Sequence, residues 1–101
     1  MNICFNEDSQ KVYNRLPIEI RTAISIVQNR IEAAVLRKYP NAVATSGFRS
    51  GGYNRDCGGK PDSLHLWGCA RDYTIRSLGD NPCIEGMTVI KSNLCWHVQE
   101  K

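Results

Sequence analysis

The first third of the chain carries apolar residues at the spacing of one face of a helix. Between Pro17 and Pro40, these residues recur every three or four positions, which is typical of an amphipathic helix. The positions are Ile20, Ile24, Val27, Ile31 and either Ala34 or Val35. Pro17 suits the first turn of this helix and Pro40 marks its end, because proline disrupts a helix interior. A shorter helical turn is predicted at residues 9–15.

After Pro40 the pattern changes to short apolar runs separated by turn residues. Strands are predicted within residues 42–48, 69–75, 87–90 and 94–100. Residues 50–63 form a loop rich in glycine, and residues 77–83 form a turn. A helix followed by strands predicts an α+β domain over residues 1–101, with the long helix packed on a small antiparallel sheet.

Length and charge narrow the function classes. The 101 residues are enough for one core, and thirteen basic and ten acidic residues are scattered along the chain, with a net charge of +3. This distribution does not favour a nucleic-acid binder, which needs a basic stripe. No apolar run approaches the about 20 residues of a membrane-spanning helix, and the first residues have no signal-peptide pattern. We expect a monomer that is made in the cytoplasm and has no membrane span.

The cysteines do not form a recognisable motif. They are Cys4, Cys57, Cys69, Cys83 and Cys95, an odd number with no CxxC pair. Reduced thiols are expected in a chain without an export signal, and a disulfide formed after release from the cell stays open.

His65, Asp72 and His97 are the candidate metal ligands. Two imidazoles and a carboxylate are the minimum set for an open metal site. On a straight helix His65 and Asp72 would be separated by about 10.5 Å along the axis, too far for two ligands of one ion. A turn at residues 65–68 that leads into a strand would bring them together. Spacing alone leaves open whether the three are ligands or ordinary polar residues.

Three segments carry a resemblance to a known family. TSGFRSGGYN at 45–54, SLHLWGCARDY at 63–73 and WHVQ at 96–99 resemble the M15 family of zinc peptidases, which cut D-alanyl-D-alanine or related peptides of the bacterial cell wall. The middle segment is the most specific, because it matches at its serine, histidine, glycine, alanine and aspartate. The short length resembles the bacteriophage members, which are lytic enzymes that act on the cell wall after release.

The resemblance implies a role for each matching residue. His65, Asp72 and His97 would be the ligands of Zn²⁺, and a fourth position would stay open for water. Arg49 would face the carbonyl oxygen or carboxylate of a peptidoglycan peptide. Ser63 would lie beside the site and either hold the loop or bind the peptide.

One position departs from the family pattern. Members usually carry a glutamate or aspartate three residues before the last histidine as general base, and here that residue is Leu94. A general base contributes typically about 10²–10⁴-fold in rate. Glu85 is the predicted substitute, and Asp62 and Asp80 are weaker candidates. The substrate bond stays open between D-Ala–D-Ala and L-Ala–D-Glu.

Several neighbours of the site have two readings. Tyr53 is expected to contact the substrate, although a loop tyrosine also serves as a cover for a sheet edge. Trp96 should point away from His97 into the core, because alternate side chains of a strand face opposite ways. Cys95 shares the face of His97, so it either approaches the metal as a fourth ligand or fills the core.

Leu94 also supports a second function. A domain of the same fold that keeps zinc but has lost catalysis would bind the cell wall or a partner protein. The sequence is therefore compatible with both a zinc peptidase and a zinc-binding domain without catalysis.

Overall fold

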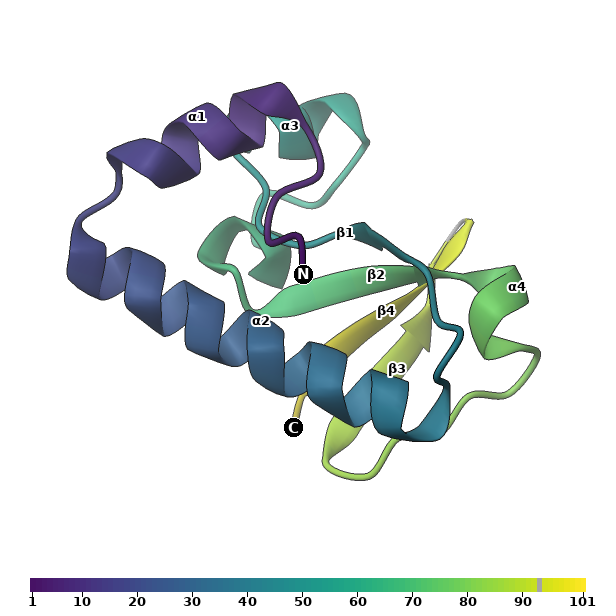
Figure 1. The fold of residues 1–101 in the computed structure, drawn as a ribbon. Helices are drawn as coiled ribbons and strands as arrows, with labels where there is room; N and C mark the ends of the chain where they lie inside the picture. Colours follow the sequence, from purple (N-terminus) through teal and green to yellow (C-terminus); the bar gives the residue numbers. More distant parts are fainter. Residues whose placement is uncertain (93) are drawn as a thin grey trace.

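The computed structural model describes residues 1–92 and 94–101, and it has the predicted α+β architecture. Its elements in chain order are α1 (Glu7–Arg15), α2 (Ile18–Lys38), β1 (Ala44–Ser46), α3 (Gly51–Asp56), the 3₁₀ helix η1 (Leu64–Trp67), β2 (Ala70–Thr74), α4 (Ile75–Leu78), β3 (Met87–Lys91) and β4 (Cys95–Glu100). The long helix α2 lies across one face of the sheet (Figure 1). All four predicted strands are present, each within a residue or two of the expected limits.

The sheet is antiparallel throughout, with strand order β1-β2-β4-β3. The central pair is β2 and β4, whose register sets Asp72 opposite His97 and Tyr73 opposite Trp96. In Figure 1 the C-terminal strand β4 lies between β2 and β3, so the last residues of the chain sit in the middle of the sheet.

The buried face of α2 follows the predicted stripe except at one end. Ile24, Ile31 and Val35 are buried, whereas Ile20 is 48% exposed. The expectation that Ile20 belongs to the core is therefore wrong. Its helical turn extends past the edge of the sheet (Figure 1), where there is no strand to cover it. Helical periodicity alone does not show how far the sheet reaches.

Two apolar clusters hold the elements together. The larger lies between α2 and the sheet and contains Ile31, Val35, Tyr73, Leu78, Ile84, Trp96 and Val98. Trp96 is thus in the core, as predicted. The smaller cluster joins the N-terminal segment to α2 and the end of β1, and its buried members are Cys4, Ile24 and Phe48. All five cysteines are free thiols.

The glycine-rich loop contains a short helix that the sequence did not indicate. α3 begins after Ser50, whose hydroxyl oxygen accepts the N–H of Tyr53 at 3.2 Å. The same hydroxyl donates to the Asp8 carboxylate at 2.6 Å and so ties α3 to α1. A six-residue helix with two leading glycines has little intrinsic stability, so these tertiary contacts decide that it forms.

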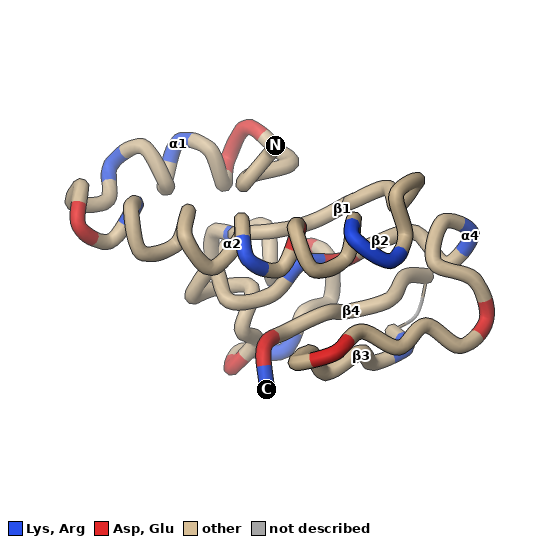
Figure 2. Tube along the Cα trace, turned by 60° about the horizontal axis from the view of Figure 1, so that its bottom comes forward, with Lys and Arg blue, Asp and Glu red and all other residues tan. Residues whose placement is uncertain are grey.

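Charged residues of both signs are spread along the trace. Basic and acidic residues are interspersed over the helices and strands (Figure 2). In the part of the chain that the structure describes, no helix is long and apolar enough to cross a membrane.

Candidate metal centre

The two central strands place Asp72 and His97 on the face of the sheet opposite α2. Side chains alternate along a strand, and Arg71 and Tyr73 contact α2, so Asp72 between them faces away from it. Val98 is likewise buried in the core, and His97 beside it points to the other face. Because the register pairs Asp72 directly with His97, their side chains meet without any loop contribution.

His65 reaches the same place from η1. The hydroxyl oxygen of Ser63 caps this turn by accepting the N–H of His65 at 3.2 Å. The turn ends at Gly68, which has a φ of +70°. A Cβ at Gly68 would also lie 2.5 Å from a methyl group of Ile24, so both backbone conformation and space require glycine. The predicted turn at residues 65–68 is confirmed.

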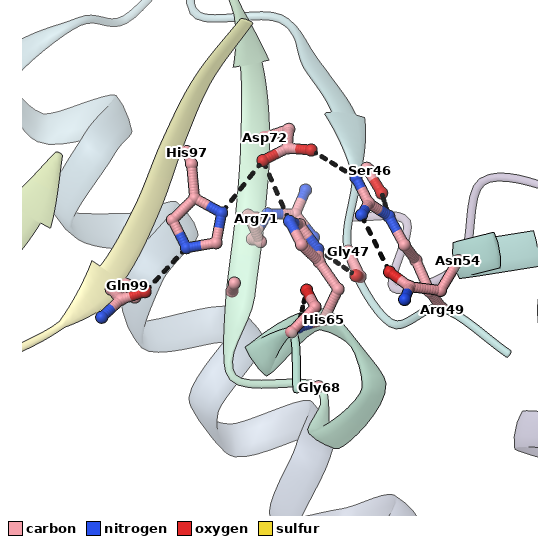
Figure 3. Close-up of polar contacts among 12 residues, drawn as sticks. Ser46, Gly47, Arg49, Asn54, His65, Gly68, Arg71, Asp72, His97 and Gln99 are labelled. Carbon is pink, nitrogen blue, oxygen red and sulfur yellow. Dashed lines mark hydrogen bonds and ion pairs between the residues drawn. The ribbon is translucent and has the colours of Figure 1, made fainter. Parts of the chain in front are cut away.

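The three side chains converge on one carboxylate oxygen (Figure 3). Asp72 Oδ1 lies 3.0 Å from His65 Nε2 and 3.5 Å from His97 Nδ1. The two imidazole rings are edge to face, with centroids 5.0 Å apart. One potential ligand atom from each residue lies within 4.8 Å of the others. Ligand atoms of one zinc ion lie within about 4 Å of each other, so the group is slightly wider than a loaded site.

The outer nitrogens of both histidines are already engaged. His65 Nδ1–H donates to the carbonyl oxygen of Gly47 at 2.7 Å, and His97 Nε2–H donates to Gln99 Oε1 at 2.7 Å. These bonds leave His65 Nε2 and His97 Nδ1 facing Asp72 Oδ1. When these nitrogens carry protons they donate to the carboxylate, and when they lose them their lone pairs can bind a cation together with it. Such outer hydrogen bonds orient metal-binding histidines. The donor set therefore fits a divalent metal ion.

Charge in the site is closely balanced. Burial raises the pKa of Asp72, but hydrogen bonds from His65 and His97 and the charge of Arg49 outweigh it and hold the pKa well below its usual range. Burial lowers the pKa of His97, yet the bonds with Asp72 and Gln99 leave it raised overall. Asp72 is consequently ionised at neutral pH, as a metal-binding carboxylate must be.

Arg49 lies on the second oxygen of the same carboxylate. Its guanidinium donates to Asp72 Oδ2 at 2.7 Å, to Ser46 Oγ at 3.0 Å and to Asn54 Oδ1 at 3.2 Å. The backbone N–H of Arg49 also donates to the carbonyl oxygen of His65 at 2.9 Å. The loop after β1 is thus fixed against η1, and the permanent positive charge lies beside the three candidate ligands (Figure 3).

A pocket opens over these residues. It is lined by residues 58–60 and 62–65, by Ile90–Ser92 on and after β3, and by Gln99. Arg49, Asp72 and His97 line it as well, so the three candidate ligands all border the pocket. A peptide entering the pocket would meet the candidate metal site and the arginine together.

The other predicted site residues separate into two groups. Ser63 lines the pocket and Asp62 does too, whereas Tyr53 and Glu85 are not among its lining residues. Glu85 is exposed in the turn before β3, five positions from the strand residue that pairs with His97. Tyr53 is half-buried on α3. The structure therefore does not bring Glu85 or Tyr53 to the site.

Cys95 lies next to the site without joining the three-residue group. Its thiol is half-buried, and burial together with the neighbouring Asp72 charge raises its pKa to about 11. Among the described residues, the candidate ligand group contains only His65, Asp72 and His97.

Two contributors have a role that the sequence did not assign. Alternation along the strand puts Gln99 on the face of His97, two positions away, and the structure shows that it accepts the hydrogen bond of His97 Nε2. Gly47 acts through its backbone carbonyl, which any residue possesses, so its role has no signature in the sequence.

Comparison with known proteins adds a family assignment. A sequence model of the Peptidase M15 family matches residues 5–88. Searches of curated proteins and of solved structures give no match. The matched range contains His65 and Asp72, and the sheet brings His97 to them from outside that range. This chain belongs to the Peptidase M15 family.

Proposed function

We propose that the protein is a zinc-dependent peptidase that hydrolyses peptidoglycan stem peptides, at the D-Ala–D-Ala or the L-Ala–D-Glu bond. The observation that carries the proposal is that the side chains of His65, Asp72 and His97 converge. The outer N–H of each imidazole already donates to a protein oxygen, which orients the other ring nitrogen toward Asp72. Membership of a peptidase family supports the hydrolytic reaction. The resemblance to short phage enzymes supports action on the cell wall after release.

Each residue around the pocket has a proposed role in the reaction. A zinc ion held by His65, Asp72 and His97 would supply a water activated for attack on an amide, because zinc lowers the pKa of such a water to about 7. Arg49 attracts the carbonyl oxygen or a carboxylate of the peptide, since its guanidinium is always charged. Ser46 and Asn54 keep that guanidinium in place. Ser63 holds the turn that presents His65.

Asp62 is the best placed carboxylate for the general base. Apart from Asp72, it is the acidic residue among the described residues that line the pocket. Asp72 is occupied by His65, His97 and Arg49, so it is not free to accept a proton. Glu85, the substitute predicted from the sequence, lies outside the pocket lining.

The two acids can be compared directly. Asp62→Asn and Glu85→Gln remove one negative charge each from exposed positions. We expect Asp62→Asn to lower kcat by about 10²-fold or more, because a general base contributes that much, and Glu85→Gln to leave kcat unchanged. Steady-state hydrolysis of a muropeptide measures both. A slow Glu85→Gln variant beside an active Asp62→Asn variant would return the base to Glu85.

A metal-binding module without catalysis is the second candidate. The observation that favours it is Leu94, which occupies the family's usual base position and is 82% exposed. Such a domain would keep the zinc site and bind the cell wall or a partner protein without cutting a bond.

Zinc content and digestion of bacterial sacculi separate these functions. The purified protein is assayed for bound metal, then incubated with sacculi and with D-Ala–D-Ala dipeptide while new amino groups are counted. We expect one zinc ion per chain and release of amines. One zinc ion without amine release would favour the module, and a protein that takes up no zinc would contradict both.

A further inference from the structure

Gln28 is a polar residue on the apolar face of α2. Its side chain is fully buried, and the residues one turn away on either side, Ile24 and Ile31, belong to the core clusters. Burying a carboxamide among apolar groups is costly unless its hydrogen bonds are satisfied. The partners of Gln28 therefore indicate what the polar group does there.

Every partner of this carboxamide is on or next to β2. Nε2 donates to the carbonyl oxygens of Gly68 at 2.6 Å and Ala70 at 3.0 Å, and Oε1 accepts from the Arg71 guanidinium at 2.9 Å. Arg71 is 1% exposed. A guanidinium only donates and a backbone carbonyl only accepts, so the orientation of the Gln28 amide is fixed.

The two carbonyls lie in the short connection between two candidate metal ligands. Gly68 is three residues after His65, and Ala70 is two residues before Asp72. A single NH₂ group that bonds both carbonyls fixes the segment where η1 ends and β2 begins. The distance between His65 and Asp72 depends on the shape of that turn.

Gln28 also touches the segment that orients His65. A Cβ built on Gly47 would stand only 2.7 Å from Gln28 Oε1, so the amide packs directly against the Gly47 backbone. The carbonyl oxygen of Gly47 is the acceptor for His65 Nδ1–H. One side chain on α2 thus contacts the backbone on both sides of the His65 imidazole.

We propose that Gln28 is a positioning residue for the metal centre: from the opposite face of the sheet, it sets the separation and orientation of His65 and Asp72. The inference rests on the proposed zinc site. Gln28 does not contact His65 or Asp72 side chains itself, and it acts through the backbone at Gly68, Ala70 and Gly47. Removing its amide leaves two buried carbonyls without their donor, so the turn must rearrange.

Two substitutions test this role. Gln28→Met keeps a long side chain but cannot form hydrogen bonds. Gln28→Glu keeps the shape and the bond with Arg71, so it preserves the fold if Gln28→Met does not, yet its carboxylate cannot donate to Gly68 and Ala70. Val35→Ala is the matched control, because Val35 is fully buried on the same helix face and belongs to the main core.

Three measurements are made on each folded protein. Chelator competition gives the Zn²⁺ affinity, the visible spectrum of the Co²⁺-loaded protein reports ligand geometry, and amide hydrogen exchange of residues 68–72 is recorded without metal. We expect both Gln28 variants to bind Zn²⁺ about 10–100-fold more weakly, as for other residues that orient metal ligands, with an altered Co²⁺ spectrum. Val35→Ala should lower the melting temperature and leave affinity and spectrum unchanged.

The outcomes separate this inference from the proposed function. Gln28 variants with reduced stability but wild-type affinity and spectrum would overturn the inference, because Gln28 would then serve only the core. A wild-type protein that binds neither metal would overturn the proposed function instead. In that case the amide exchange measured without metal decides. Exchange at residues 68–72 that is faster than in the wild type in both Gln28 variants, but not in Val35→Ala, supports the positioning role. Exchange at the wild-type rate in the Gln28 variants rejects it.

Discussion

A single carboxylate organises the site. Asp72 places one oxygen between two imidazoles and the other on Arg49, and its side chain is 5% exposed. Three partners with positive or hydrogen-donating character keep it ionised in spite of burial, which is why its pKa lies below the usual range. At the residue scale, Arg49 both bonds Asp72 and lines the pocket.

Arg49 is expected to contribute strongly to turnover. Arg49→Ala removes the fixed positive charge beside the reacting bond, and we expect kcat/KM on a stem peptide to fall by about 10²–10³-fold. Arg55→Ala on α3 is the control, because Arg55 is exposed and does not line the pocket. Steady-state kinetics give kcat/KM for both variants. Equal values of kcat/KM would show that Arg49 does not contribute to the reaction.

The helix α2 combines two tasks at the scale of elements. Its apolar positions Ile31 and Val35 build the core against the sheet, and its polar positions Gln28 and Glu32 bond the buried side chains of β2. The apolar spacing predicted the first task. The second depends on side chains of β2 that lie more than 40 residues further along the chain, so helical periodicity gives no indication of it.

Buried and exposed positions of the apolar stripe on α2 should contribute differently to stability. Ile31 is fully buried, whereas Ile20 is 48% exposed. We expect Ile31→Ala to lower the free energy of unfolding by about 2–5 kcal/mol, and Ile20→Ala by much less. Urea unfolding of the two variants provides the comparison. Equal losses would show that the first turn of α2 is covered in solution.

Stability should fall in alkali because of Tyr73. Burial and the hydrogen bond to Glu32 raise the pKa of Tyr73 above its unfolded value of about 10. A raised pKa means that the neutral hydroxyl is favoured in the folded state. Its contribution is complete below about pH 10 and is lost as the pH rises toward the folded pKa.

Tyr73→Phe tests this pH dependence. The variant should be less stable than the wild type at pH 7, because Glu32 loses its donor, and the difference should shrink above pH 10. Denaturant unfolding from pH 7 to 11 measures it. A difference that stays constant over this range would reject the assignment to Tyr73.

At the scale of the whole molecule, the candidate metal site joins three elements that are distant in sequence. His65 comes from η1, Asp72 from β2 and His97 from β4. An ion bound by all three binds the folded state and not the unfolded one, so it stabilises the fold by mass action.

Removal of metal should therefore lower the melting temperature. With free Zn²⁺ at about 1,000 times Kd, the stabilisation is about 4.1 kcal/mol, which in a chain of this size is a clear shift in Tm. Scanning calorimetry with Zn²⁺ and with a chelator measures the shift. His97→Gln should abolish it, and a shift that persists in this variant would place the ion elsewhere.

The sequence by itself determined the long helix, the four strands and the identity of the chemical groups. The periodicity of α2, the four strands and the turn that ends at Gly68 follow from short-range preferences, and the two histidines and Asp72 stand out by residue type and by family resemblance. The expected candidate ligands do lie together.

Only the tertiary structure decided which other groups reach them. Glu85 and Asp62 are both acidic residues in turns, and the tertiary structure places Asp62 in the pocket lining and Glu85 outside it. Gln28 bonds the backbone of Gly68, 40 residues away, and the Gly47 carbonyl bonds His65, 18 residues away, so short-range patterns give no indication of either contact. Residue type fixes what a side chain is able to do, and long-range packing fixes its neighbours.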